Sequence, residues 1–218
     1  MKIRKYVFGM GSGCCGTSSL SVLLNEQPRA FVGHELAPTL PWQATREAVQ
    51  EFTVFKWNQL NHQGSLFDLV GDVGTYYLPY VRFLMHQYNL ALKDECEFKF
   101  IILKRDKEET IQAFLDKFKR QSNNPLQNNK SPGQFADSWD ASFPKYEGVS
   151  LREATSMYYD DYYREAESLL NDFPNRVRLY MMDDLNSEEK VEELLRFSGV
   201  ENPNVIVNIK ENQRAFAR

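Results

Sequence analysis

The chain has 218 residues, of which 42% are hydrophobic and 26% charged, and its formal net charge is −4. This length and composition predict one globular domain over residues 1–218 that buries a core of its own without disulfides or a structural metal. The acidic balance argues against a dedicated nucleic-acid-binding protein, but it allows a local basic pocket.

The chain has three cysteines, Cys14, Cys15 and Cys96, and their number and spacing indicate the redox conditions in which the protein works. An odd number with two adjacent in sequence does not form a disulfide framework and fits a reducing cytoplasm. No run of about 18 apolar residues occurs, and the apolar run near the first residue is too short for a signal peptide, so we expect no membrane span and a cytoplasmic protein. We expect no metal site, and the oligomeric state stays open.

The first elements predicted along the chain are a strand, a glycine-rich turn and a helix. Residues 4–9, "RKYVFG", are rich in β-branched and aromatic residues, which favours a strand. Glycines follow at 9, 11, 13 and 16, and leucines then recur at helical spacing from Thr17 until shortly before Pro28. This order is typical of the entry to a nucleotide-binding α/β fold.

Strands and helices alternate through the rest of the chain. Strands are predicted at 52–57, 65–70, 98–103 and 177–182, and helices at 77–92, 107–119, from Ser150 to about 173, and from Asn186 to Gly199. The run 98–103, "FKFIIL", is apolar enough to be a strand buried on both faces. We therefore predict an α/β fold with three layers, a mainly parallel sheet flanked by helices and a P-loop-like architecture.

One segment interrupts this alternation. Residues 120–149 are rich in Asn, Ser, Pro and Gly but also contain Phe135, Trp139, Phe143 and Tyr146. Such long segments often serve as lids or binding flaps, and the aromatic rings are able to stack on a sugar or phenol. A surface excursion that its aromatic side chains hold closed is the equally open alternative.

The glycine-rich turn carries the clearest chemical signal. From Gly11 to Ser18 its spacing is G-x-x-x-x-G-T-S, which differs from the phosphate-binding pattern G-x-x-x-x-G-K-[ST] by the missing lysine. Backbone N–H groups and the following helix N-terminus still favour an anion, whereas nucleoside triphosphate hydrolysis is disfavoured. A tight turn without a ligand remains the alternative.

Five segments in order along the chain resemble the sulfotransferases that use 3′-phosphoadenosine 5′-phosphosulfate (PAPS). Residues 11–20, "GSGCCGTSSL", resemble the phosphosulfate loop of that family, and 25–35, "NEQPRAFVGHE", its segment ending in an acid. The other three segments are 70–84, 98–114 and 158–200, which resemble the family's "GDKTP…LP" segment, its 3′-phosphate segment and its last helix, strand and helix.

The resemblance assigns roles to residues of this chain. It implies that the phosphosulfate is held by Gly11, Ser12, Gly13, Cys14, Cys15, Gly16, Thr17 and Ser18, and the 3′-phosphate by Arg105, with Lys210 and Arg214 folding over the nucleotide. Glu35 is then the general base that accepts a proton from a hydroxyl or amine, with His34 as the weaker candidate for that role. The resemblance implies that the acceptor is a small molecule or a glycan, and we expect no nucleic-acid partner.

Three positions depart from the family pattern. Cys14 and Val73 stand where the family has basic residues, and Ala113 stands where it has a serine. Lys56, at the end of the predicted strand 52–57, is a candidate replacement cation, and Thr110 or Gln112 a candidate for the serine. A catalytically inactive nucleotide- or ligand-binding protein therefore stays open as the alternative function, and a kinase with a degenerate loop as a third.

Individual residues also keep plainer interpretations. The alternative role of Arg105 is a salt bridge to Asp106 or Asp72 without a ligand. The alternative for Glu35 is a solvated acid on the surface. The cysteines of the loop have a lowered thiol pKa if they act as nucleophiles at a helix N-terminus, or else are small packing residues.

Overall fold

A computed structural model describes residues 4–64, 66–92, 96–120, 126 and 141–209 of the 218. Lys210 and Arg214, which the sequence assigns to nucleotide binding, lie outside the described residues, as do Phe135 and Trp139 of the proposed flap. No helix within the described ranges combines the length and apolar character that crossing a bilayer needs.

Five parallel strands form one sheet in the order β2-β3-β1-β4-β5. The strands are β1 (Arg4–Gly11), β2 (Ala30–His34), β3 (Leu69–Val73), β4 (Cys96–Lys104) and β5 (Val177–Met181). The helices are α1 (Thr17–Asn25), α2 (Arg46–Gly64), α3 (Val81–Leu92), α4 (Lys107–Arg120), α6 (Leu151–Asp172) and α7 (Glu188–Phe197), with 3₁₀ turns η1 (Thr75–Tyr80) and η3 (Met182–Asn186). The predicted α/β fold is confirmed.

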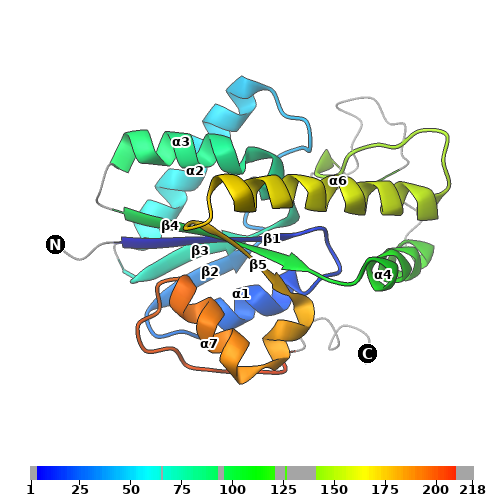
Figure 1. Ribbon diagram of the computed structural model, residues 1–218. Coiled ribbons are helices and arrows are strands. Elements are labelled where there is room, and N and C mark those ends of the chain that lie inside the picture. Colours follow the sequence, from blue (N-terminus) through cyan, green and yellow to red (C-terminus); the bar gives the residue numbers. More distant parts are fainter. Residues whose placement is uncertain (1–3, 65, 93–95, 121–125, 127–140, 210–218) are drawn as a thin grey trace.

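Helices cover both faces of the sheet, with α1 and α7 on one side and α2, α3 and α6 on the other (Figure 1). Side chains of β1 alternate between the two layers, as a strand requires. Tyr6, Phe8 and Met10 belong to the core under α2, α3 and α6, whereas Val7 belongs to the core under α1 and α7. From Tyr6 to Met10 the non-glycine side chains of β1 are apolar and buried on both faces, which explains why the sequence predicts a strand there.

The predicted strand at 52–57 is wrong, because these residues lie inside α2. Val49, Phe52, Lys56 and Leu60 are buried at helical spacing, whereas Val54 is 56% exposed. The aromatic and β-branched run "FTVFKW" favours a strand over six residues, but the helical period becomes visible over the nineteen residues of the helix. This correction changes the environment of Lys56.

Three other boundaries differ from the sequence expectations. The strand expected at 65–70 is β3, which begins at Leu69 and continues through Val73 with all five residues buried. β2 was not predicted as a strand. The helix expected at 77–92 starts as the 3₁₀ turn η1, which contains Pro79, and becomes α-helical at Val81.

Helix capping was predicted well because it depends on neighbours in sequence. Asp106 Oδ1 accepts from the N–H of Glu109 at 3.0 Å at the start of α4. Ser150 and Glu153 form the expected capping box at the start of α6. The cap of α7 is Ser187 rather than Asn186.

The described end of the 120–149 segment packs against α6. Phe143 is 2% exposed and its ring meets Phe114 and Tyr158 edge-on. The Tyr146 hydroxyl donates to Asp161 at 2.8 Å. For these two side chains the structure supports the alternative in which aromatic residues hold the segment closed.

Candidate functional site

The candidate site lies at the carboxyl edge of the sheet, where β1, β2, β3 and β4 all end. The main chain continues the strand pairing past the strands: Glu35 N–H donates to Val73 O at 2.8 Å and Gly74 N–H to Gly9 O at 2.9 Å. β1 has β3 on one side and β4 on the other. Its carboxyl end is thus where the chain's connections diverge, the usual ligand position in open α/β sheets.

The loop from Gly11 to Thr17 has the backbone that its glycines predict. Gly13, Cys14 and Gly16 have φ values of 95°, 54° and 91°, in the left-handed region that glycine favours. At Gly11 a Cβ would stand 2.3 Å from Cys15 Sγ, so only glycine fits there. Cys15 is fully buried and packs behind the loop in the core beneath α1.

Tyrosines of α6 support the inner side of this loop. The Tyr163 hydroxyl donates to Leu103 O at 2.8 Å and lies 3.2 Å from Ser12 Oγ. Burial raises the pKa of the Tyr163 phenol, and that of Tyr162, although a hydrogen bond with the Gly11 main chain acts in the opposite direction on Tyr162. The phenols are therefore neutral supports, and the sequence reasoning missed them because only their helical face was visible.

The N-terminus of α1 is left open to a ligand. Gly16 is its N-cap and supplies no side chain. Within the described part of the chain, the N–H groups of Thr17, Ser18 and Ser19 have no hydrogen-bond acceptor. His34 Nε2, at the end of β2, lies 3.4 Å from both Thr17 Oγ1 and Ser18 Oγ. Two hydroxyls and an imidazole therefore come together at the first amides of α1.

A buried hydroxyl lies on the other side of the loop. Thr75 is 4% exposed, and its Oγ1 has no hydrogen-bond partner in the described part of the chain. Its methyl carbon lies 3.8 Å from where a Cβ of Gly13 would stand. An unpaired buried hydroxyl beside an anion-type loop fits a polar ligand.

Arg105 reaches the crest of the loop from the end of β4. Its Nη1 donates to Cys14 O at 3.2 Å, and its Nε donates to Glu109 Oε2 at 2.9 Å. The salt bridge therefore forms with Glu109 of α4, and not with Asp106 or Asp72. Lys104, the preceding residue, turns elsewhere and lies over the Tyr163 ring at 4.9 Å.

Glu35 and Lys56 occupy the β2 and β3 end of the same edge. Glu35 is half-buried, with φ 52°, and its charge is one of the influences that raise the pKa of Tyr76. Lys56 is fully buried and pairs with Asp72 Oδ2 at 3.2 Å. Its Nζ is therefore engaged inside the protein, which differs from the strand-end cation that the sequence suggested.

The other candidate replacements are also engaged. Thr110 Oγ1 donates to Asp106 O at 2.8 Å inside α4, and Gln112 Nε2 donates to Asp116 at 2.9 Å. Val73 is fully buried in the core under α1. Asp72 accepts hydrogen bonds from the Leu36 N–H and from Lys56, Tyr76 and Tyr77. From the sequence, Asp72 was considered only as a possible salt-bridge partner of Arg105.

The cysteine thiols are not activated nucleophiles. Burial raises the pKa of Cys14, against the influence of Lys117 and Arg105, and raises the pKa of Cys15 to about 12. The lowering of the thiol pKa that a helix N-terminus alone predicts is thus wrong for both, because desolvation is the larger effect. The packing interpretation of these residues holds.

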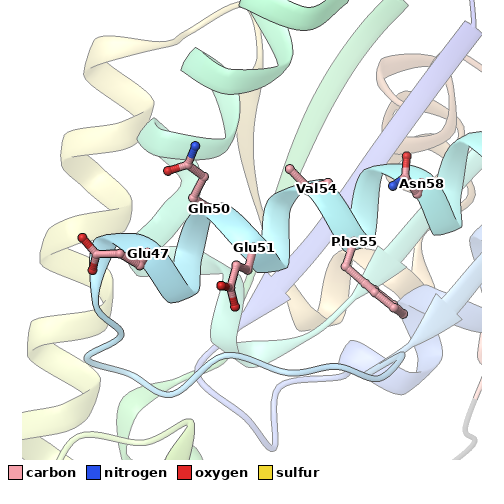
Figure 2. Close-up of a pocket in the computed structure, with 6 residues that line it drawn as sticks. All are labelled: Glu47, Gln50, Glu51, Val54, Phe55 and Asn58. Atoms are coloured by element: carbon pink, nitrogen blue, oxygen red, sulfur yellow. The ribbon is translucent and has the colours of Figure 1, made fainter.

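A surface hollow lies elsewhere, on the outer side of α2 (Figure 2). Its lining residues are Glu47, Gln50, Glu51, Val54, Phe55 and Asn58. All six come from one helix, in the layer across the sheet from α1, so they do not converge on a ligand from several sides.

Comparisons with known proteins add little to this geometry. No protein-family model matches the chain, and no curated protein matches it. Among solved structures, shikimate kinase from Bacteroides thetaiotaomicron is similar over 88% of this chain and 94% of that one, with 13% sequence identity and a TM-score of 0.39.

Proposed function

We propose that this protein is a sulfotransferase that moves a sulfuryl group from PAPS to a hydroxyl or amine of a small molecule or glycan. The main support for this proposal is the position of His34 at the N-terminus of α1. Its Nε2 lies 3.4 Å from Thr17 Oγ1 and 3.4 Å from Ser18 Oγ. Amides at a helix N-terminus and hydroxyl donors stabilise a phosphosulfate group, as they stabilise phosphate.

Arg105 supports the second part of the proposal, binding of the 3′-phosphate. Its guanidinium is held at the loop crest through Cys14 O but is only partly buried, with 27% of the side chain exposed. Guanidinium groups bind phosphate with two parallel hydrogen bonds. A phosphate that binds through the Nε donor competes with Glu109 for it.

Glu35 is the proposed general base. Its carboxylate accepts the proton of the acceptor hydroxyl while that oxygen forms a bond to sulfur. The bond between sulfur and the 5′-phosphate oxygen breaks in the same step, and adenosine 3′,5′-bisphosphate leaves with that electron pair. Most of the acceleration then comes from positioning and from charge stabilisation at the α1 N-terminus.

A second candidate function is nucleotide or ligand binding without catalysis. It is favoured by the contacts of Lys56, the residue proposed as the replacement cation. Lys56 Nζ is bonded to Asp72 and to Leu36 O, so this buried lysine is not free to neutralise a developing negative charge. Loss of one such donor costs roughly 3–4 kcal/mol in a transition state. Arg105 remains as a cation at the loop crest, and the charge of Lys117 on α4 also acts on Cys14 there.

The test measures binding and transfer separately. Adenosine 3′,5′-bisphosphate is titrated calorimetrically into the full chain, and transfer from [35S]PAPS is measured to a panel of phenols, sugars and amines. The proposal expects a dissociation constant below about 1 mM. It also expects Glu35→Gln to lower transfer by about 10²–10⁴ while binding is retained.

The matched control is Glu51→Gln, which makes the same change at an exposed acid of α2. Binding without transfer to any acceptor in the panel selects the second candidate. Absence of binding heat for the bisphosphate overturns both.

A further inference from the structure

The main-chain N–H and C=O of Leu36, the residue that follows Glu35, are both bonded to one buried ion pair. The N–H of Leu36 donates to Asp72 Oδ1 at 3.2 Å, and its carbonyl accepts from Lys56 Nζ at 2.6 Å. Lys56 and Asp72 also bond to each other at 3.2 Å, with both side chains fully buried. The Tyr76 hydroxyl adds a longer contact to Leu36 O, at 3.3 Å.

The two charged groups come from different elements. Lys56 lies on α2, where the ring of Phe52 also faces its Nζ at 5.4 Å, and Asp72 lies on β3. Tyr76 and Tyr77 of η1 donate to Asp72 Oδ2 at 2.9 and 2.6 Å. Every oxygen of the carboxylate therefore has a donor, and α2, β3 and η1 are joined at one point.

Glu35 itself has a conformation that needs such support. Its φ is 52°, in the left-handed region, which is unfavourable for a residue with a side chain. The chain reverses sharply there, because the side chain of Leu36 lies over Gly33, with Cγ 2.3 Å from where a Cβ of Gly33 would stand. On its other side, Glu35 N–H is bonded to Val73 O at 2.8 Å.

A buried ion pair is an inefficient way to stabilise a fold, since well-packed apolar residues of the same volume often do as well. Its value lies in fixing one arrangement of the groups that it bonds. Here those groups are the main-chain N–H and C=O of Leu36, in the two peptide groups that flank the residue directly after the candidate base. Desolvation lowers the pKa of Lys56, and the neighbouring carboxylate of Asp72 acts against that change.

We propose that Lys56 and Asp72 are positioning residues that fix the backbone from which the carboxylate of Glu35 projects. The proposal rests on the proposed function for the role of Glu35, but the clamp on Leu36 is testable without it. In this proposal Lys56 binds the Leu36 carbonyl inside the protein and does not contact PAPS.

The test uses a variant that removes both charges together. Lys56→Met with Asp72→Leu removes both charges and the oxygen that accepts from the Leu36 N–H, and it leaves no uncompensated buried charge, so it is the variant expected to fold. Tyr76→Phe removes the remaining hydroxyl that faces Leu36 O. The matched control is Tyr88→Phe, because the Tyr88 hydroxyl is buried without a partner in the described residues of the chain.

The first readout is hydrogen exchange of backbone amides by NMR. We expect the Leu36 amide to exchange at least about tenfold faster in the double variant, with the β4 amide of Ile101 unchanged in all variants. Tyr76→Phe keeps the Asp72 acceptor of this amide, so its effect on the exchange rate is smaller. Tyr88→Phe keeps the wild-type rate at Leu36. Wild-type exchange at Leu36 in the double variant overturns the clamp, whatever the activity of the protein.

The second readout is the kinetic constants of [35S] transfer to p-nitrophenol. The proposal expects kcat to fall by about tenfold or more with the KM for PAPS and the affinity for adenosine 3′,5′-bisphosphate within about twofold. Faster exchange with an unchanged kcat overturns the positioning role. A wild-type chain that binds no bisphosphate contradicts the proposed function, while the exchange result still decides the clamp.

Discussion

The Arg105 guanidinium donates to the carbonyl of Cys14 at 3.2 Å, although 91 positions separate the two residues. The contact joins the end of β4 to the crest of the loop that follows β1. The parallel pairing of these strands, with Gly11 opposite Leu103, brings the two segments to the same edge. A cationic group is thus placed beside the candidate anion loop.

Arg105→Ala is expected to weaken binding of adenosine 3′,5′-bisphosphate by about 10- to 100-fold, since a hydrogen bond to a charged group contributes about 1.5–3 kcal/mol. Calorimetric titration measures the change. Arg196→Ala is the matched control, because Arg196 also forms a salt bridge across one helical turn, with Glu192 of α7. Equal affinities for wild type and Arg105→Ala would remove this residue from the site.

Glu109→Gln is expected to tighten the same binding, because Glu109 Oε2 competes with a phosphate for the Nε donor of Arg105. The pair is largely exposed on the glutamate side, so the gain is small, about twofold to fivefold. The same titration at two salt concentrations checks it. Weaker binding in this variant would mean that Glu109 orients Arg105 instead of competing for it.

Lys56→Met alone is expected to lower the free energy of unfolding by about 3–5 kcal/mol, because it leaves Asp72 buried and unpaired. The double variant with Asp72→Leu recovers a large part of that loss, because no buried charge remains. Urea unfolding followed by circular dichroism measures both. A single variant as stable as wild type is incompatible with a charged pair at this position.

Alkaline pH is expected to destabilise the protein through its buried tyrosines. The affected phenols, whose pKa burial raises above the ordinary value of 10.0, are Tyr76, Tyr77, Tyr158, Tyr162 and Tyr163. Above about pH 10 the unfolded chain loses these protons first, so the folded state holds more protons and stability falls as pH rises. Below that pH these groups contribute their full stabilisation.

Urea unfolding at about pH 8, 9, 10 and 11 measures this dependence, with tyrosinate absorbance as a second signal. The absorbance of the buried tyrosines should appear together with unfolding. If these phenols ionise while the chain stays folded, they are in contact with solvent, which contradicts their burial.

Cys15 is expected to resist alkylation in the folded protein. It is fully buried and its pKa is raised to about 12, so almost none of it is thiolate at neutral pH. Iodoacetamide treatment followed by mass spectrometry of peptides should find Cys15 unmodified until urea is added. Modification of Cys15 before Cys96, which is only half-buried, would show that the loop opens.

The first strand, the loop and the first helix were predictable because their signals are local. The left-handed φ at Gly13 and Gly16 and the leucine face of α1 depend on residues within one or two turns of each other. The capping box of Ser150 and Glu153 spans four positions and was also predicted. The strand-like run in α2 was misread because its composition is local and its buried face is visible only over the whole helix.

The meeting of distant residues was decided by the tertiary structure. The sequence by itself determined an α/β fold with an anion-type loop, and it proposed Arg105 as the anchor of the 3′-phosphate and His34 as the weaker candidate for the general base. Only the packing of α2 on β3 and of β1 on β4 decided that Lys56 pairs with Asp72 under Leu36, and that Arg105 bonds to Cys14 and Glu109. Such contacts depend on the register and packing of segments tens of residues apart, which no local pattern encodes.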